Sequence, residues 1–216
     1  LGNILDFENL TKDNIYVLES PILSNSQFEK FTVFFKDSLK VLDCTFDVQT
    51  NLKKRLDQLC SEAEIAVREG YKHLILSDKK ISEKKAAIPM ILAFGAINSK
   101  LVNLGIRGFA SINVQTGEVL DTHSFAVLFG IGATIINPYL VFDSIYQRYE
   151  KKLFGKFNYE ECIQRYIKSV DNGLLKIMSK MGISVLSSYR GGCNFEAVGL
   201  SRAIVAEYFP GMISRI

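Results

Sequence analysis

The stretch that decides the fold runs from VLDCTF at residues 41–46 to HLIL at residues 73–76. Both ends are short apolar runs of the kind found in buried strands. Between them, apolar residues recur every three or four positions, which is typical of a helix with one buried face: Leu52, Leu56, Leu59, Ala63 and Val67. Gly70 follows where a left-handed helix terminator is needed. The stretch therefore predicts a βαβ unit with parallel strands and a right-handed crossover.

The same cycle continues downstream of residue 76. Ser77 to Lys85 is predicted to be a loop, and Pro89 suits the first turn of a second helix that Gly105 follows. The further elements that we expect are a helix over 88–103, a strand over 106–114, helices over 124–129, 139–149 and 159–181, the last kinked at Gly173, and strands over 183–186 and 195–198. The predicted fold class is α/β, with repeated βα units in a parallel sheet that is either open and incomplete or TIM-barrel-like.

No second hydrophobic core and no linker interrupt the sequence. We therefore expect one β/α domain over residues 40–216, with residues 1–39 as an N-terminal segment packed on that body. The sequence opens with Leu1-Gly2-Asn3, without an initiator Met or a basic-then-apolar leader, and it closes without a polar tail. We expect a piece of a longer polypeptide.

Composition excludes several classes of protein. With 48% hydrophobic and 23% charged residues in 216, the chain is too apolar to be disordered. Its apolar stretches are shorter than the roughly 20 residues of a membrane-spanning helix. A net charge of +3 is too slight for a dedicated binder of nucleic acid or acidic membranes. The lysines at 79–85 are interpreted as a solvated loop, and the alternative of a nucleic-acid module predicts salt-sensitive retention on DNA.

Candidate metal ligands and nucleophiles are sparse. The four cysteines lie far apart without a C-x-x-C pair, so local spacing builds neither a zinc nor an iron–sulfur site, and reduced, mostly buried thiols are expected. Asp121, His123 and Ser124 group the residue types of a nucleophilic or metal site. With two histidines in the chain, capping of the following helix by Asp121 or Thr122 explains the same residues better.

A glycine-containing turn is a candidate phosphate-binding site. Arg190, Gly191 and Gly192 follow the strand expected at 183–186, so backbone amides and the guanidinium could cradle a phosphate at the carboxyl edge of the sheet. The spacing matches neither the dinucleotide fingerprint nor the P-loop. A structural turn with Arg190 paired to a carboxylate is the competing interpretation, and Cys193 has no histidine near in sequence to activate it.

One longer stretch is more specific than these signals: GLLKIMSKMGIS at 173–184, continued by SYRG at 188–191 and FEAVGL at 195–200. It closely resembles the central domain of the large subunit of bacterial glutamate synthase. Collinear matches extend over nearly the whole chain: LESPIL at 18–23, LILSD at 74–78, IP at 88–89, FA at 125–126, GIGA at 130–133, PYL at 138–140 and YF at 208–209.

The resemblance implies a role inside a larger intracellular, cytoplasmic enzyme. In that family a glutaminase domain frees ammonia from glutamine, and a synthase domain with FMN and a 3Fe-4S cluster makes glutamate from 2-oxoglutarate. A small NADPH-oxidising subunit supplies the electrons. The central domain joins the two active domains of the same chain, resembles the flavin barrel in topology and helps to wall the ammonia tunnel. The resemblance thus implies no catalytic residue, cofactor or metal in this chain, no nucleic-acid or membrane partner, and no activity of the fragment alone.

The chain departs from the family pattern at two places. Where the family shows adjacent histidines, this sequence has Asn98-Ser99 and His123-Ser124. A metal site built on those histidines could therefore not be shared by the family and this chain. The alternative function is a stand-alone β/α barrel enzyme that binds FMN or a phosphate ligand through Arg190, Gly191 and Gly192, and tight FMN binding by the purified chain would favour it.

Overall fold

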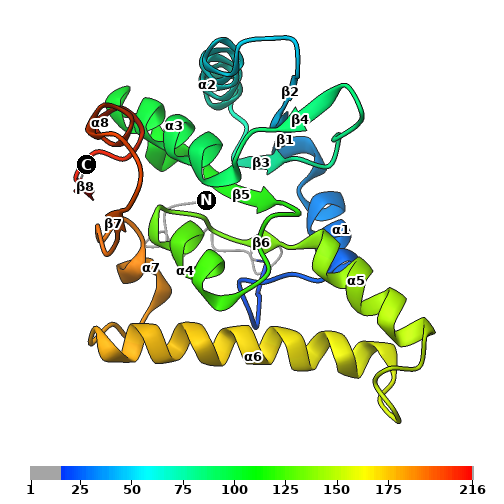
Figure 1. The fold of residues 1–216 in the computed structure, drawn as a ribbon. Coiled ribbons are helices and arrows are strands. Elements are labelled where there is room, and N and C mark those ends of the chain that lie inside the picture. The colour runs from blue at the N-terminus through cyan, green and yellow to red at the C-terminus, as the bar shows by residue number, and fades with distance from the viewer. Residues whose placement is uncertain (1–15, 216) are drawn as a thin grey trace, which may run out of the picture.

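The structure is a computed structural model that describes residues 16–215, so the first 15 residues of the expected N-terminal segment and residue 216 lie outside it. Helices and strands alternate through most of this range (Figure 1). The elements are α1 (Asn25–Phe34), β1 (Leu39–Asp43), β2 (Thr45–Asp47), α2 (Leu52–Arg68), β3 (His73–Ser77), β4 (Lys85–Ala87), α3 (Met90–Asn103), β5 (Ser111–Gln115), α4 (Thr122–Gly130), β6 (Ile136–Asn137), α5 (Tyr139–Glu150), α6 (Tyr159–Lys180), α7 (Leu186–Tyr189), β7 (Glu196–Ala197), α8 (Arg202–Tyr208) and β8 (Ile213–Ser214), with 3-10 turns at Lys36–Ser38 and Arg107–Phe109.

The main sheet has four parallel strands in the order β1, β3, β5, β6. Each neighbouring pair is connected through one helix, α2, α3 or α4 in turn, so the order of strands in space follows the order in the chain. This confirms the α/β class and the parallel sheet. Gly70, with φ of +93°, ends the turn after α2 in the left-handed conformation that the sequence predicted.

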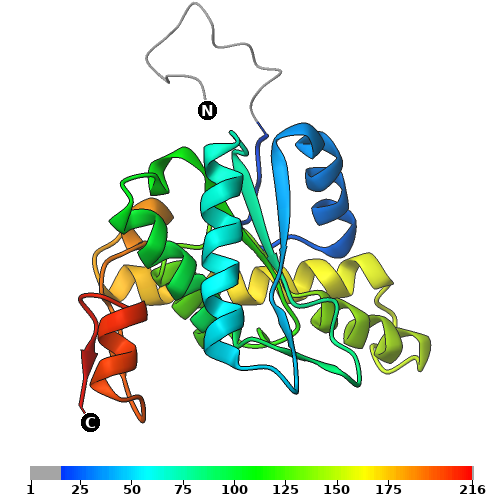
Figure 2. The same ribbon diagram turned by 90° about the horizontal axis from the view of Figure 1, so that it is seen from above.

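Both faces of the sheet are covered. Leu74 and Leu76 of β3 belong to the large core shared with α2 and α3, whereas Ile75 between them packs with Phe28 and Phe31 of α1. Figure 2 shows α1 on one side of the sheet and α2 with α3 on the other. Because alternate side chains of a strand point to opposite faces, a strand buried on both faces reads as an unbroken apolar run. That is why HLIL has no polar alternation.

The sheet is open in the described residues and closes into neither a TIM barrel nor a flavin-type barrel. Four strands are half of the eight that such a barrel requires. The face that a barrel would turn inward is instead covered by α1, through Phe28 and Phe31. Of the two sheet forms that the sequence left open, the structure shows the open one.

The edge of the sheet beyond β6 is occupied by the N-terminal part of the chain. Ile22 forms a parallel bridge with Ile136, and Leu23 donates its amide to the Ile136 carbonyl at 3.0 Å. The Ile136 amide donates in turn to the Pro21 carbonyl at 2.9 Å. This short segment therefore extends the sheet by one partner.

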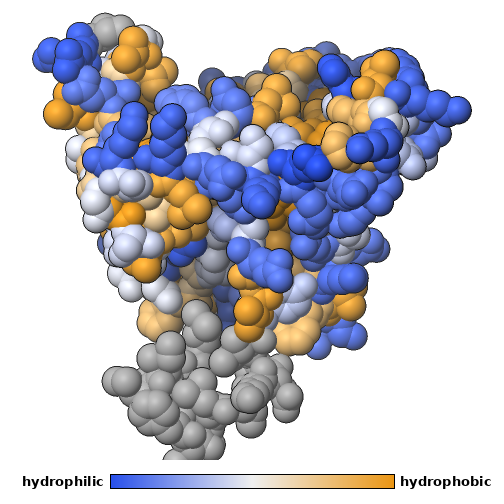
Figure 3. Space-filling view, turned by 90° about the horizontal axis from the view of Figure 1, so that it is seen from below, coloured by the Kyte–Doolittle hydropathy of each residue, from blue (hydrophilic) through white to orange (hydrophobic). Residues whose placement is uncertain are grey.

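The longest helix of the described residues, α6, lies along one side of the molecule (Figure 1). Its 22 residues span about 33 Å at 1.5 Å per residue. Asn158 and Glu161 cap its start reciprocally: the Asn158 side chain accepts the Glu161 amide at 2.9 Å, and the Glu161 side chain accepts the Asn158 amide at 2.8 Å. The helix runs unbroken from Tyr159 to Lys180 and shows no bend in Figure 1, so the kink expected at Gly173 does not form. Figure 3 shows hydrophilic and hydrophobic residues interspersed on the face that carries it.

Two predicted strand positions need correction. The segment expected as a strand over 183–186 contains the start of α7, a short helix over Leu186–Tyr189, because its residues pack against α4 rather than entering a sheet. The strand expected over 106–114 begins only at Ser111, because Arg107–Phe109 forms a 3-10 turn. The strand at 195–198 exists as β7, which pairs with β8 in a separate two-stranded sheet.

Candidate functional site

The carboxyl edge of the main sheet is the first candidate site. Its four strands are parallel, so their last residues meet at one edge: Asp43, Ser77, Gln115 and Asn137. In open α/β sheets, ligands bind beyond the carboxyl ends of the strands. The polar side chains gathered at this edge are therefore candidate ligand-binding residues.

A chain of amide and hydroxyl groups crosses this edge. Ser77 Oγ donates to Gln115 Oε1 at 2.9 Å, and Gln115 Nε2 donates to Asn137 Oδ1 at 3.1 Å. Asn137 Nδ2 then donates to the Leu23 carbonyl at 2.9 Å and to Asn25 Oδ1 at 3.0 Å. These groups are hydrogen-bonded to one another, so they connect three strands to α1 and are not free to bind a ligand.

Asp78, directly after β3, is the buried carboxylate of the edge. It accepts Thr116 Oγ1 at 2.5 Å and the Gly117 amide at 3.1 Å. Burial, together with the charge of Asp78 and a hydrogen bond to it, raises the pKa of Tyr139. Asp78 thereby fixes the loop after β5 against the start of α5.

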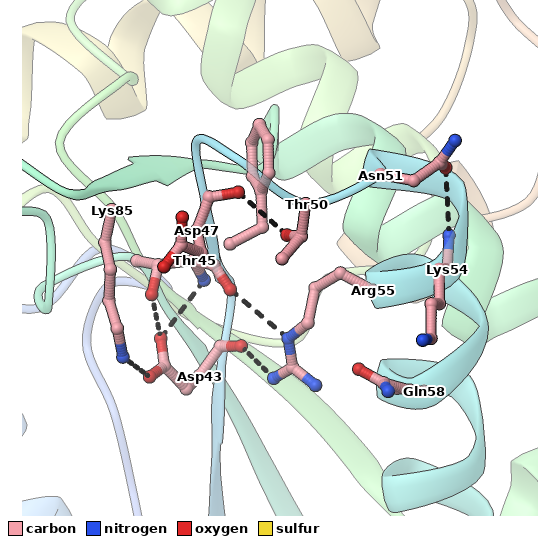
Figure 4. Close-up of a pocket in the computed structure, with 10 residues that line it drawn as sticks. Asp43, Thr45, Asp47, Thr50, Asn51, Lys54, Arg55, Gln58 and Lys85 are labelled. Atoms are coloured by element: carbon pink, nitrogen blue, oxygen red, sulfur yellow. Dashed lines mark hydrogen bonds and ion pairs between the residues drawn. The ribbon is translucent and has the colours of Figure 1, made fainter.

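A pocket of about 330 Å³ opens where β1 and β2 meet α2 (Figure 4). Both signs of charge line it, which suits a small polar ligand better than an apolar one. Its lining residues are Asp43, Thr45, Phe46, Asp47, Thr50, Asn51, Lys54, Arg55, Gln58 and Lys85.

Most charges of this pocket are already engaged. Arg55 donates to the backbone carbonyls of Thr45 and Asp43 at 3.2 and 2.7 Å, and it pairs with Glu62 at 2.5 Å. The Glu62 hydrogen bond is the main reason that the pKa of Arg55 is raised. The Asp43 carboxylate accepts the Thr45 hydroxyl at 2.7 Å and lies 3.9 Å from the ammonium of Lys85. Asp43 and Arg55 are therefore not free for proton transfer, whereas Asp47 and Lys54, which also line the pocket, form no ion pair among residues 16–215.

Cys44 lies beside this pocket but is not a nucleophile. Its side chain is fully buried, and burial raises the pKa of the thiol, with smaller contributions from the charges of Asp78 and Asp43. A thiol that stays protonated at neutral pH reacts poorly. The expected burial is confirmed for Cys44 and Cys162, whereas Cys60 is half-buried and Cys193 is exposed.

A second pocket, of about 490 Å³, lies in the connection between α5 and α6. Its residues run from Tyr149 to Asn158 and include Lys152, Lys156 and Phe154. The pocket is formed by this connecting loop, and its lining contains no cysteine, serine, threonine or histidine.

The turn predicted to cradle a phosphate lies at the opposite edge of the sheet. Arg190, Gly191 and Gly192 follow the helix α7 rather than a strand. Arg190 donates to the carbonyl of Thr134, just before β6, at 3.3 Å. The Gly191 amide donates to the Gly130 carbonyl at 2.7 Å. The predicted position at the carboxyl edge is thus wrong, because residues 183–186 do not form the strand that would have placed the turn there.

The residues that stand in place of adjacent histidines have structural contacts. Asn98 Oδ1 accepts Arg107 Nε at 2.7 Å, and Ser99 Oγ donates to the Tyr208 carbonyl at 3.0 Å. Asp121 accepts the Ser124 amide at 2.9 Å and caps α4, as predicted. The ring of His123 meets that of Phe195 edge-on, at 6.3 Å between centroids.

Sequence reasoning missed Asp78 and Arg107. Asp78 directly follows the apolar run at 73–76, so its place after a strand could have been used. Arg107 sits in a segment expected to be a strand, and no sequence signal marked its burial.

Within residues 16–215, no three side chains of His, Cys, Asp or Glu gather closely enough to hold a metal ion. None of the helices in that range is both long and apolar enough to cross a membrane.

Comparison with known proteins gives the family. The model of the "Glutamate synthase central domain" family matches residues 1–201. The glutamate synthase [NADPH] large chain of Azospirillum brasilense is 50% identical over 219 residues, covering 100% of this chain and 14% of the relative. That of Bacillus subtilis is 40% identical over 199 residues, covering 92% of this chain and 13% of the relative. The chloroplastic ferredoxin-dependent glutamate synthase of Oryza sativa is 40% identical over 229 residues, covering 99% of this chain and 14% of the relative.

The chain thus spans about one seventh of the length of the curated relatives it matches. The family model covers most of its length and includes the GLLKIMSKMGIS stretch that carried the resemblance. This chain belongs to the glutamate synthase central domain family.

Proposed function

We propose that this chain is the non-catalytic connecting domain of a glutamate synthase large chain. It holds a glutaminase domain and an FMN-containing synthase domain of the same polypeptide in a fixed relation and helps to wall the path of ammonia between them. The observation that carries the proposal is the match of residues 1–201 to the central domain family. Relatives about seven times longer supply the remaining domains in their own chains.

The packing supports a spacer. One core cluster joins the sheet to α2, α3, α4 and α6, so these elements move as one body. The helix α6 adds a straight element of 22 residues that a flexible linker could not replace. A stiff body of this kind keeps two reaction centres at a constant separation.

The chemistry of the parent protein belongs to the proposal too. Glutamine and 2-oxoglutarate are its substrates, FMN and a 3Fe-4S cluster its cofactors, and a small NADPH-oxidising subunit its partner in the cytoplasm. The residues described here do not fit an iron–sulfur cluster, since Cys44, Cys60, Cys162 and Cys193 are dispersed over the fold and form no cluster. The cluster is therefore assigned to another domain.

Two finer points remain part of the proposal. One is the division into residues 1–39 as an N-terminal segment and 40–216 as the body. The other is a topology related to the flavin barrel, which rests on the sequential parallel order β1, β3, β5, β6.

The test is the coupling of the two half-reactions in the longer polypeptide. Gly173→Val, which disturbs the contact between α6 and α4, is expected to raise glutamine hydrolysed above glutamate formed, with free ammonia as the difference. Ser169→Ala, on the exposed face of α6, is the control and should leave the two amounts equal. Unchanged coupling in a Gly173→Val protein whose unfolding temperature has dropped would argue against the spacer role.

The chain alone separates this proposal from an enzyme. We expect no glutamate from glutamine and 2-oxoglutarate and no bound-flavin spectrum on titration with FMN. Tight FMN binding that is lost in Arg190→Met would favour the stand-alone enzyme instead.

A further inference from the structure

Two arginine side chains reach the same loop at the amino edge of the sheet, where the chain enters β6. Arg107 donates to the carbonyl of Gly132 at 3.2 Å, and Arg190 donates to the carbonyl of Thr134 at 3.3 Å. The two acceptors are two residues apart in the same loop. Both side chains are half-buried.

Neither arginine has an acidic partner among residues 16–215. Three other arginines pair with an acid: Arg55 with Glu62, Arg68 with Glu64 and Arg215 with Glu196. The remaining described arginines, at positions 148, 165 and 202, also have no acidic partner among residues 16–215, but their side chains are exposed to water. Burial lowers the pKa of Arg107, and the positive charge of Arg190 lowers it further. Like charges taken out of water without an anion are costly, so this pair is an exception that needs a cause.

The two arginines differ in their remaining capacity for hydrogen bonds. Arg107 uses all three of its nitrogens, on Asn98, Ala110 and Gly132. Arg190 makes one hydrogen bond, and its Nε is buried with no partner among the described residues. A guanidinium has five N–H donors in a planar fork, so most of those of Arg190 are unused.

The ligand that fits is a carboxylate. The two Nη nitrogens of an arginine match the two oxygens of a carboxylate end-on, and this contact does not need the buried Nε of Arg190. A phosphate held by a turn would also need backbone amides, but the Gly191 amide is engaged with Gly130 at 2.7 Å. Arg107, fixed by its three acceptors, contributes a positive field rather than contacts.

We propose that Arg190, supported by the charge of Arg107, receives an Asp or Glu side chain from another domain of the longer polypeptide. The inference rests on the proposed function in one respect: it needs a neighbouring domain of the same chain. The relatives, of which this chain covers about 14%, leave ample sequence to provide one.

The test compares one variant in two contexts. In this chain alone, Arg190→Met removes an unpaired cation, so the unfolding temperature should stay unchanged or rise. In the longer polypeptide the same variant removes a charge pair, so the unfolding temperature should fall by several degrees and proteolysis next to residues 186–194 should speed up several-fold. Arg202→Met, which changes an exposed arginine of α8, is the matched control and should shift neither.

Other results would overturn the proposal. A similar drop in both contexts would make Arg190 a purely internal support for Thr134, or a partner of an acid in residues 1–15. An unfolding temperature that is unchanged in both contexts would show that Arg190 forms no charge pair with another domain. Arg190→Lys separates charge from geometry: it should recover only part of the loss, because an ammonium cannot make the paired contact.

A free anion is distinguished by titration of the chain alone. Inorganic phosphate and acetate should produce no saturable change that depends on Arg190. Saturable phosphate binding lost in Arg190→Met would replace the carboxylate side chain with a free ligand. Failure of the coupling experiment on Gly173, with the Arg190 effect intact, would remove the spacer role but keep this interdomain contact.

Discussion

Gly173 of α6 lies against Thr122 of α4, so closely that a Cβ atom built on the glycine would come 2.6 Å from both Thr122 Oγ1 and Cγ2. Real Cβ atoms do not approach other atoms to that distance, so a side chain at 173 would have to displace the Thr122 side chain or move α4 away from α6. The glycine therefore sets the spacing between α6 and α4.

Gly173→Val is expected to destabilise the chain by about 2–3 kcal/mol, because overpacking outweighs any gain in helix propensity. Chemical denaturation of wild type and variant measures this difference in the free energy of unfolding. Ser169→Ala, exposed on the same helix, should change stability by less than about 0.5 kcal/mol. Pairing Gly173→Val with Thr122→Ala should recover part of the loss, and no recovery would contradict the contact.

Asp78→Ala should cost about 2–4 kcal/mol of unfolding free energy, because it leaves the Thr116 hydroxyl and the Gly117 amide without their buried acceptor. Urea denaturation checks this. The control is Asp57→Ala, which removes an exposed carboxylate near Lys53 and should cost no more than about 0.5 kcal/mol. Equal effects of the two substitutions would show that Asp78 does not hold the loop after β5.

His73 should make stability depend on pH. Burial, with smaller effects from positive charges such as Lys72, lowers its pKa from 6.5 to about 4. Between pH 6.5 and about 4, the unfolded state therefore binds a proton that the folded state does not bind. The contribution of His73 to the free energy of unfolding is therefore complete above pH 6.5 and decreases as the pH drops towards 4. Discounted for partial exposure, the loss is about 1–2 kcal/mol.

The two histidines provide the comparison. His73→Gln should flatten the dependence between pH 6.5 and 4, whereas His123→Gln, at an exposed position, should retain it. Denaturation midpoints over this range give the answer. The same slope in wild type and His73→Gln would contradict the assignment.

Thiol labelling should separate the four cysteines by burial. Cys193 is exposed and should react within the dead time of an aromatic disulfide reagent, whereas Cys44 and Cys162 are buried and should react more than about 10³-fold more slowly, through unfolding. Burial raises the pKa of Cys60 to about 11, so this half-exposed thiol should react between the two groups. Cys193→Ser should remove the fast phase. A fast phase that persists would place another thiol at the surface.

The sequence predicted the fold class because local signals were strong where burial was two-sided. The apolar run at 73–76 and the three-to-four spacing after Leu52 each match their element, and Gly70 marks the turn between them. Helix starts were also predictable where a short polar side chain caps them, as Asp121 does.

Tertiary contacts decided what the sequence could not. Whether the sheet closes depends on α1, whose Phe28 and Phe31 fill one face through contacts with residues far along the chain. Residues 183–186 have the apolar content of a strand, but they join no sheet among residues 16–215. Arg190 was found as a candidate by its turn, whereas its neighbour Arg107 became visible only in three dimensions.

The bridge between Ile22 and Ile136 has a kinetic consequence. Asn137 holds the Leu23 carbonyl across 114 positions, so the first described segment leaves the ribosome long before its partner exists. Contacts that join distant parts of a chain form late and slow the approach to the native state. Phe28 and Phe31 can pack on Ile75 earlier, but the contact of their cluster with Ile135 forms only when synthesis reaches β6, so part of this aromatic surface stays exposed to other molecules during that interval.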